Sequence, residues 1–406
     1  MTRRAITIGA GQAAIAFAAK LRDLDPQIEI LLIGEEASLP YQRPPLSKKY
    51  MTGEMEADRL LLRPAEWFDE HRVVCRTGVK VCGLHPEARE IEIDGERLGF
   101  DKLLIATGST PRTLPAEIGG DLQGVFTLRD LADADAIAGA LARAGDAVII
   151  GGGYIGLEAA AVFARRGLRV TVVEMADRIL KRVASAETAD TVRAMHQGEG
   201  VTILEDTALS RLEGENGRVT KAVLADGTEI PAGLVLVGIG VIPNDSLARQ
   251  TGIKCGNGIE VDAATRTSNP DIHAAGDVAS FDFHGNRIRL ESVGNAIEQA
   301  EHAARVIAGS DAPYPPVPWF WSDQYDMKLQ IAGLNIGYDR TVVRPGAHPG
   351  GRSIWYFKGD GFLAVDAIND SKAYMFGKKI LELGRTVTPE QAADAEFDLK
   401  TLIKGN

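Results

Sequence analysis

Three things are scarce in this chain of 406 residues: cysteine, long apolar runs and excess positive charge. Its only cysteines are Cys75, Cys82 and Cys255, too few for a disulfide framework, which predicts a reducing, cytoplasmic location. No run approaches the roughly 18 apolar residues of a membrane-spanning helix, so we expect no membrane partner. The basic start, residues 1–4, leads directly into an apolar strand, so we expect no signal peptide. The net charge of −11 argues against nucleic acid as a partner.

Glycine, in contrast, is plentiful, and two glycine-rich turns dominate the sequence. The first spans residues 9–14 and the second spans residues 151–156, and each lies between an apolar strand and an alanine-rich helix. One such turn could be incidental, but two turns in equivalent settings indicate two dinucleotide sites on one chain. That arrangement suits electron transfer between a bound flavin and a diffusing nicotinamide.

The first turn has the residues that a pyrophosphate site needs. We expect a buried strand at Ile6–Ile8 and a helix at Ala13–Leu24. Gly9 permits the sharp turn, Gly11 lets the backbone approach a pyrophosphate, and the small Ala14 lets helix and strand pack closely. The amino end of the helix would then face the phosphates with free N–H groups and the positive end of its dipole.

The second turn repeats this logic, with an expected strand over residues 147–150 and an expected helix over residues 156–166. Its candidate site residues are Gly151, Gly153, Tyr154, Ile155 and Gly156.

Each turn is followed by a strand that runs into an acidic residue. The first of these strands leads to Glu35, and the second, Arg169–Val173, leads to Glu174. A carboxylate at this place accepts hydrogen bonds from ribose hydroxyls and repels a 2′-phosphate, so Glu174 favours NADH over NADPH. Downstream, Arg178 and Arg182 could meet a phosphate, contact the adenosine of NADH or be solvated surface charges.

The second dinucleotide fold interrupts the first. An apolar strand leads to Ala106, Thr107 and Gly108, and the chain then crosses out of the first domain. It returns in a strand that ends at Asp277, whose carboxylate can reach a ribityl hydroxyl because ligands bind beyond the carboxyl ends of parallel strands.

A proline-rich linker at residues 313–318 precedes strand-like runs, a hairpin signal around residues 359–361 and a helix at about Ser371–Gly384. The predicted fold is α/β, with two Rossmann-like dinucleotide-binding domains, the second inserted in the first, and a C-terminal α+β domain. The predicted domains are 1–112 with 239–315 for FAD, 113–238 for NADH and 316–406 for the C-terminal domain.

Further segments along the whole chain match a known family, and the first and last of them are more specific than the glycine turns. They are Tyr41-Gln42-Arg43-Pro44-Pro45-Leu46-Ser47-Lys48, Val237–Asn244, Ala275-Gly276-Asp277 and Trp319-Phe320-Trp321-Ser322-Asp323-Gln324. With them the chain resembles the NADH-dependent, FAD-containing ferredoxin reductases of multicomponent oxygenase systems, which share the glutathione-reductase-like fold. Disulfide reductases of that fold carry a cysteine pair where this chain has Arg43–Lys48, so here the flavin must pass its electrons to an external acceptor.

The resemblance implies an NADH:ferredoxin oxidoreductase, which takes hydride from NADH onto FAD and passes single electrons to a 2Fe–2S ferredoxin that serves an oxygenase. Two alternatives stay open: an NADH reductase for rubredoxin or a small acceptor, and an NADH-sensing flavoprotein of the apoptosis-inducing-factor type.

Lys48 and Glu158 are the catalytic candidates that the resemblance implies, with Lys48 near flavin N5 and paired with Glu158; by spacing alone both could be surface charges. Arg43 and Arg129 are candidates for the phosphate side of FAD, but each could equally form an exposed ion pair. Trp321 is a candidate to lie near the flavin, but it could instead anchor the core of the C-terminal domain. A helix starting at about Ser292 would aim its positive end at the reduced flavin. The FAD candidates are Gly9, Gly11, Ala14, Glu35, Arg43, Lys48, Ala106, Thr107, Gly108, Arg129, Asp277, Val293 and Trp321. The NADH candidates are Gly151, Gly153, Tyr154, Ile155, Gly156, Glu158, Glu174, Arg178, Arg182, Ile239, Gly240 and Glu291. No metal site is expected.

Charge suggests where a ferredoxin would dock. Residues 316–406 carry 11 basic and 11 acidic side chains, so the whole net charge of −11 lies in the rest of the chain. An acidic ferredoxin would be steered to the neutral C-terminal domain, near Lys372, Lys378 and Lys379, although each lysine alone could be an ordinary solvated charge.

Overall fold

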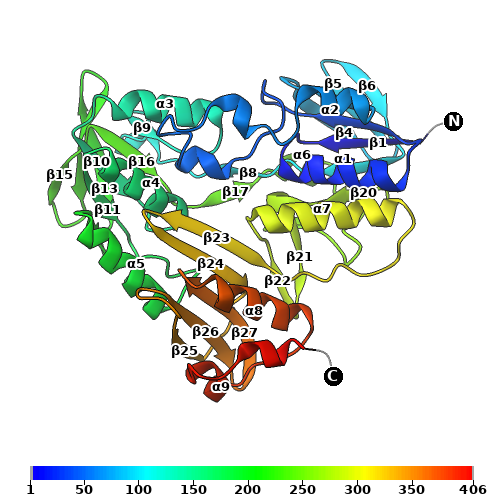
Figure 1. Ribbon diagram of the computed structural model, residues 1–406. Coiled ribbons are helices and arrows are strands. Elements are labelled where there is room, and N and C mark those ends of the chain that lie inside the picture. Colours follow the sequence, from blue (N-terminus) through cyan, green and yellow to red (C-terminus); the bar gives the residue numbers. More distant parts are fainter. Residues whose placement is uncertain (1–2, 405–406) are drawn as a thin grey trace. The chain divides into compact units, whose positions relative to one another are not determined.

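Two five-stranded parallel sheets, one in each of two units, organise the chain (Figure 1). The computed structural model describes residues 3–404. The first unit comprises Met1–Arg43, Glu56–Thr110 and Val241–Pro316, and the second comprises Pro44–Met55, Pro111–Gly240 and Val317–Asn406.

The sheet of the first unit has the strand order β20-β7-β1-β2-β3, with all neighbours parallel. Its strands are short. They are rich in isoleucine and leucine because both faces of the sheet are covered. Helices α1 and α7 pack side by side over one face, around a core of alanines and aliphatic side chains (Figure 1). The bounds are β1 Arg4–Ile8, α1 Gln12–Leu24, β2 Glu29–Ile33, α2 Ala65–Glu70, β3 Val73–Arg76, β7 Lys102–Ile105, β20 Ile272–Ala274 and α7 Val293–Ile307.

Two smaller sheets complete the first unit, one of them antiparallel and the other mixed, because its strands β19 and β21 pair in parallel. The sheet β4-β5-β6 and the sheet β18-β19-β21-β22 pack with the other face of the parallel sheet in a second apolar core. Their bounds are β4 Val81–His85, β5 Glu90–Ile93, β6 Glu96–Gly99, β18 Cys255–Gly256, β19 Gly258–Glu260, β21 Ala279–Phe283 and β22 Asn286–Ile288; β8 Ser109–Pro111, β17 Val241–Pro243 and α6 Ser246–Gln250 are the remaining elements.

The second unit repeats the parallel sheet, in the order β12-β11-β10-β16-β9, beside the antiparallel sheet β13-β14-β15. The bounds are β9 Val125–Phe126, α3 Leu131–Leu141, β10 Asp146–Ile150, α4 Tyr154–Arg165, β11 Arg169–Val173, α5 Ala186–Gly198, β12 Thr202–Leu204, β13 Leu209–Glu215, β14 Arg218–Leu224, β15 Glu229–Pro231 and β16 Leu234–Val237.

The same unit contains a five-stranded antiparallel sheet, β23-β24-β27-β26-β25, covered by helix α8. One apolar cluster joins it to the dinucleotide fold, since Leu157 and Ile179 pack with Leu329 and Tyr356. The bounds are β23 Trp319–Gln324, β24 Met327–Gly333, β25 Arg340–Pro345, β26 Arg352–Lys358, β27 Gly361–Ile368, α8 Ser371–Glu382 and α9 Pro389–Ala393.

The predicted α/β fold class is confirmed, and the predicted strands and helices around both turns are found with ends shifted by up to two residues. The hairpin at residues 359–361 and the helix capped by Ser292 are also confirmed. The predicted boundaries of three domains stay a prediction. The structure groups the C-terminal sheet, and the segment Pro44–Met55, with the second dinucleotide fold.

Candidate dinucleotide sites and the Lys48–Glu158 pair

The first glycine turn is shaped to admit a ligand group at the start of α1. Gly9 has a φ of +108°, and a Cβ there would lie 2.2 Å from the Ala106 carbonyl oxygen, so only glycine fits. Gly11 is the N-cap residue of α1, and no side chain caps the helix. A Cβ on Gly11 would meet nothing within 4 Å, which leaves open space beside free backbone N–H groups. A pyrophosphate such as that of FAD fits this cradle.

The second turn has the same design at the start of α4. Gly151 has a φ of +107°, and its Cβ would lie 2.4 Å from the Gly238 carbonyl oxygen. Gly153 is the uncapped N-cap residue of α4, again with open space beside it. Gly156 is closely packed, because a Cβ there would lie 2.4 Å from the Gly151 carbonyl oxygen.

Among the helices longer than ten residues in the described chain, these two lack a side-chain cap. Each of the other four helices longer than ten residues in the described chain (α3, α5, α7 and α8) is capped by a side chain. The capping residues are Asp130, Ser185, Ser292 and Asp370. Of these longer helices, α1 and α4 therefore keep their first N–H groups available for an anionic ligand.

The two acidic residues after the turns have different surroundings. Both oxygens of Glu174 accept backbone hydrogen bonds, from Gly152 N and from Ala176 N, each at 2.7 Å. Glu174 therefore fixes the second turn through Gly152 and the following loop through Ala176, while its remaining lone pairs can accept ribose hydroxyls. Glu35 is exposed and forms an ion pair with Lys80 at 2.8 Å.

Lys48 and Glu158 lie together, as the resemblance implies. The Lys48 ammonium is 3.1 Å from Glu158 Oε1 and 3.9 Å from Asp323 Oδ2. Glu158 on α4 is 6% exposed and accepts two further hydrogen bonds, from the Ser47 hydroxyl at 2.6 Å and from the Ser322 hydroxyl at 2.7 Å. The pair is thus part of a built, buried site and not two solvated surface charges.

Several of the candidate FAD-binding residues follow the carboxyl ends of β7 and β20. Asp277 accepts a hydrogen bond from the Ser109 hydroxyl at 2.9 Å. The Thr107 hydroxyl donates to the Asn244 carbonyl at 2.7 Å, which holds the turn at 106–108. Of the other FAD candidates, Ala14 is buried in α1, Val293 begins α7 after its Ser292 cap, and Lys48, Arg129 and Trp321 belong to the second unit.

Two arginines expected at a ligand are engaged elsewhere. Arg43 forms a short ion pair with Glu36, and Tyr41 donates to the same carboxylate. The Arg178 guanidinium donates to backbone carbonyls of the loop that follows it, with Ala184 at 2.8 Å and Ser185 at 3.3 Å. Both contacts are intramolecular, so their predicted ligand roles stay predictions.

The remaining NADH candidates divide by environment. Ile155 and Ile239 are 47% and 39% exposed, and Arg182 is exposed. Gly240 has a φ of +98°. Glu291, which belongs to the first unit, pairs with the buried Arg289 at 2.7 Å. The Tyr154 ring packs on Phe320, and burial raises the pKa of its phenol well above the ordinary value, so it stays neutral.

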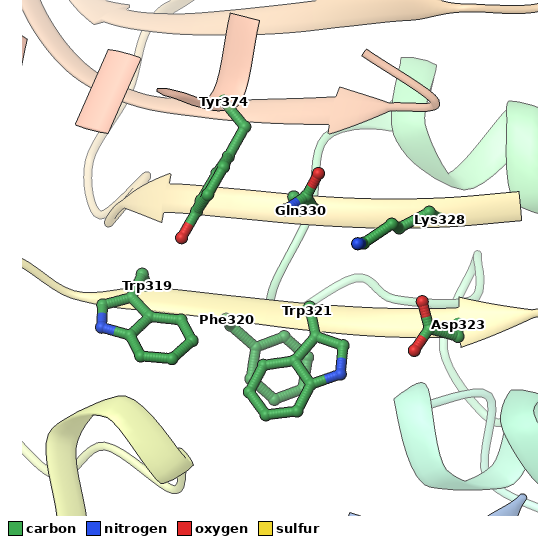
Figure 2. A pocket seen from close by; sticks show the side chains of 7 residues that line it. All are labelled: Trp319, Phe320, Trp321, Asp323, Lys328, Gln330 and Tyr374. Atoms are coloured by element: carbon green, nitrogen blue, oxygen red, sulfur yellow. The ribbon is translucent and has the colours of Figure 1, made fainter. Parts of the chain in front are cut away.

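Trp321 lines an open pocket of about 300 Å³ on the C-terminal sheet (Figure 2). Its ring stacks on Trp319 with 5.7 Å between centroids, and the Lys378 ammonium lies 5.7 Å from the Trp319 ring. Lys328 and Tyr374 complete the polar rim. Both tryptophans are half-buried, unlike the fully buried Trp355 that anchors this sheet.

Sequence reasoning missed Ser47, Ser322, Gln324 and His196, which connect to Glu158 from three segments. A signal for two of them exists, because Ser322 and Gln324 alternate with Trp321 and Asp323 and so share one face of a strand. Within residues 3–404 there is no group of three or more His, Cys, Asp or Glu side chains that could hold a metal ion. In the same residues no helix has the length and apolar character to cross a membrane.

Two family patterns match the chain. Residues 3–305 match the pyridine nucleotide-disulphide oxidoreductase family, and residues 319–403 match the reductase C-terminal domain. Rhodocoxin reductase of Rhodococcus erythropolis is 41% identical over 98% of this chain and 94% of its own length.

Solved structures agree. The ferredoxin reductase for the CYP199A2 system of Rhodopseudomonas palustris superimposes with a TM-score of 0.96 at 37% identity, covering 99% of this chain and 100% of that one. The reductase in the covalent putidaredoxin reductase–putidaredoxin complex gives a TM-score of 0.94 at 35% identity, covering 99% and 98%.

Proposed function

This chain belongs to the pyridine nucleotide-disulphide oxidoreductase family, and from that premise we propose that it takes hydride from NADH onto FAD and passes single electrons to a 2Fe–2S ferredoxin. One observation carries the proposal: two uncapped glycine-turn helices with open space at their N-caps stand on one chain. The segment where disulfide reductases keep their cysteine pair holds Arg43–Lys48 instead. The electrons therefore need an acceptor outside the chain.

The protein's part is to bind and orient. When bound, FAD supplies the chemistry, because it accepts two electrons as a hydride and releases them one at a time. The N–H groups of α1 would hold the FAD pyrophosphate, and Asp277 a ribityl hydroxyl. The N–H groups of α4 would hold the NADH pyrophosphate. Lys48, fixed by Glu158, supplies a positive charge that a reduced flavin would favour.

The choice of NADH over NADPH rests on Glu174. One of its oxygens binds Gly152 N of the turn and the other binds Ala176 N, so the side chain cannot swing away to make room for a 2′-phosphate. A phosphate there would face a carboxylate. We expect kcat/KM to be higher with NADH than with NADPH.

The proposed partner is a 2Fe–2S ferredoxin that serves an oxygenase. Two of the similar proteins above are named as a ferredoxin reductase and as a reductase joined to putidaredoxin. We place the docking surface near the C-terminal domain, at the Trp319–Trp321 pocket with its neighbouring lysines (Figure 2). These lysines are Lys328, Lys372, Lys378 and Lys379. An acidic ferredoxin would be steered there.

The decisive experiment measures electron transfer with purified protein. We expect a yellow protein whose flavin absorbance bleaches when NADH is added anaerobically, and cytochrome c reduction only when a 2Fe–2S ferredoxin is present. Added salt should slow this rate, because it screens docking charges. Faster turnover with rubredoxin, glutathione disulfide or a small quinone would contradict the ferredoxin assignment. NADH-driven dimerisation without acceptor turnover would indicate a sensor instead.

We place this reaction in the cytoplasm, where NADH is available. The three cysteines are free thiols, and burial raises the pKa of the Cys75 thiol to about 11, so that thiol is unreactive. Recovery of the protein with a periplasmic or secreted fraction would overturn this placement.

A further inference from the structure

We propose that Ser322, Gln324 and His196 form a hydrogen-bond relay that positions the Glu158 carboxylate and, through it, the Lys48 ammonium. The inference rests on the proposed function, in which Lys48 serves the flavin. It assigns positioning roles to three residues that sequence reasoning did not single out.

The relay is continuous and buried. His196 Nε2 lies 2.8 Å from Gln324 Oε1, Gln324 Nε2 donates to the Ser322 hydroxyl at 3.0 Å, and that hydroxyl donates to Glu158 Oε1 at 2.7 Å. His196 and Ser322 are fully buried, and Gln324 is 1% exposed. Breaking any of these three buried hydrogen bonds would cost free energy, so they define the geometry of the network narrowly.

Every donor in the relay points toward the carboxylate. Because Gln324 Oε1 only accepts, His196 Nε2 must carry the hydrogen. Because Ser322 accepts from the Gln324 amide, its single hydrogen goes to Glu158. Burial lowers the pKa of His196, which agrees with a neutral ring whose Nδ1 has no partner among the described residues.

The carboxylate is then held at both ends. Ser322 and Lys48 share Oε1, and Ser47 binds Oε2 at 2.6 Å. Without Ser322, Glu158 loses the one neutral donor to the oxygen that Lys48 uses. The carboxylate can then rotate, and the ammonium loses its fixed partner.

Strand β23 connects the relay to the tryptophan pocket. Its residues alternate, so Ser322 and Gln324 are buried. Trp321 and Asp323 line the open pocket (Figure 2). One strand thus carries both the anchor of Glu158 and the tryptophan surface proposed for docking. Helix α5, through His196, closes the relay on the other side.

The test compares Ser322→Ala with Ser353→Ala. Ser353 is an equally buried serine of the same sheet, whose hydroxyl accepts from Trp355 Nε1 at 3.0 Å and has no bond to Glu158. Ser353→Ala removes the buried hydrogen bond from Trp355, whereas Ser322→Ala removes two, the bond to Glu158 and the bond from Gln324. We expect Ser322→Ala to slow flavin bleaching by NADH about tenfold and Ser353→Ala to leave it unchanged. Ser322→Thr, which keeps the hydroxyl, should recover most of the rate.

A second readout does not depend on turnover. Acetylation of Lys48 by an N-hydroxysuccinimide ester, followed by mass spectrometry on the holoprotein, reports how firmly the ammonium is held. We expect several-fold faster acetylation in Ser322→Ala and no change in Ser353→Ala. If the wild type is not reduced by NADH at all, the proposed function fails, and the acetylation comparison still tests the relay.

A double-mutant cycle separates positioning from packing. If Ser322 acts through Glu158, then Ser322→Ala should add no further loss of rate to a Glu158→Gln variant. Full additivity of the two losses would overturn the proposal, as would equal acetylation of Lys48 in Ser322→Ala and Ser353→Ala.

Discussion

The two glycine turns share one backbone conformation but differ in what surrounds it. Gly9 and Gly151 have φ values of +108° and +107°, and each is blocked from substitution by a carbonyl oxygen. The third small position, however, is Ala14 in the first turn and Gly156 in the second. The following acid is exposed in the first unit and bonded to two backbone amides in the second. A shared motif thus encodes the turn, whereas the packing around it differs between the two units.

The largest expected effect comes from exchanging glycine and alanine at the third small position of the two turns, Gly156 and Ala14. Gly156→Ala would bring a Cβ to 2.4 Å from the Gly151 carbonyl oxygen, so we expect a loss of about 3 kcal/mol in stability and a large loss of NADH affinity. Ala14→Gly should cost only about 1 kcal/mol, because it removes a methyl group from a helix. Urea unfolding and NADH titration measure both changes. Equal losses of stability in Gly156→Ala and Ala14→Gly would contradict the difference in packing between the two turns.

Two buried groups, one in each unit, should respond to acid in opposite directions. In the first unit, burial lowers the pKa of His273 to about 4, so the unfolded chain takes up the proton first and stability falls as pH drops from 6.5 to 4. In the second unit, burial raises the pKa of Asp366 to about 6, so the folded chain takes up the proton first and stability rises as pH drops from 6 to 4. Each shift corresponds to about 3 kcal/mol.

Two variants test these signs. His273→Gln should weaken the loss of hydrogen-exchange protection that the first unit shows as pH falls from 6.5 to 4. Asp366→Asn should become more stable relative to wild type as pH rises from 4 to 6, with a constant difference above pH 6. If either variant keeps the pH dependence of the wild type, the assignment of that residue is wrong.

The smallest expected effect is the difference in stability between variants of Glu174 and Glu35, the acidic residues that follow the two turns. Glu174→Ala leaves the Gly152 N–H of the second turn and the Ala176 N–H of the following loop without their 2.7 Å partner, which should cost about 2 kcal/mol and narrow the preference for NADH. Glu35→Ala removes only an exposed ion pair with Lys80, so we expect no measurable change in thermal stability. A matched loss in Glu35→Ala would show that both acids support their turns.

Local patterns predicted much of this protein. The β-branched runs before each turn and the alanine-rich helices after it are found within two residues of their predicted ends. The predicted family of oxygenase-associated ferredoxin reductases is confirmed by relatives that span the chain. Arg43 and Arg178 show the limit of such patterns, because a charged side chain takes the nearest suitable partner in the fold. They bond to Glu36 and to loop carbonyls.

By itself, the sequence determined the two dinucleotide turns, the strands that precede them and the absence of a cysteine pair beside Lys48, since each depends on residues close together in the chain. Only the tertiary structure decided which side chains surround Glu158. Ser47, Ser322 and His196 come from three separate segments, and hydrogen bonds between them form only after long loops have closed. Steric and hydrogen-bonding limits on the backbone act over a few residues, whereas the partners of a buried charge are chosen by packing across the whole unit.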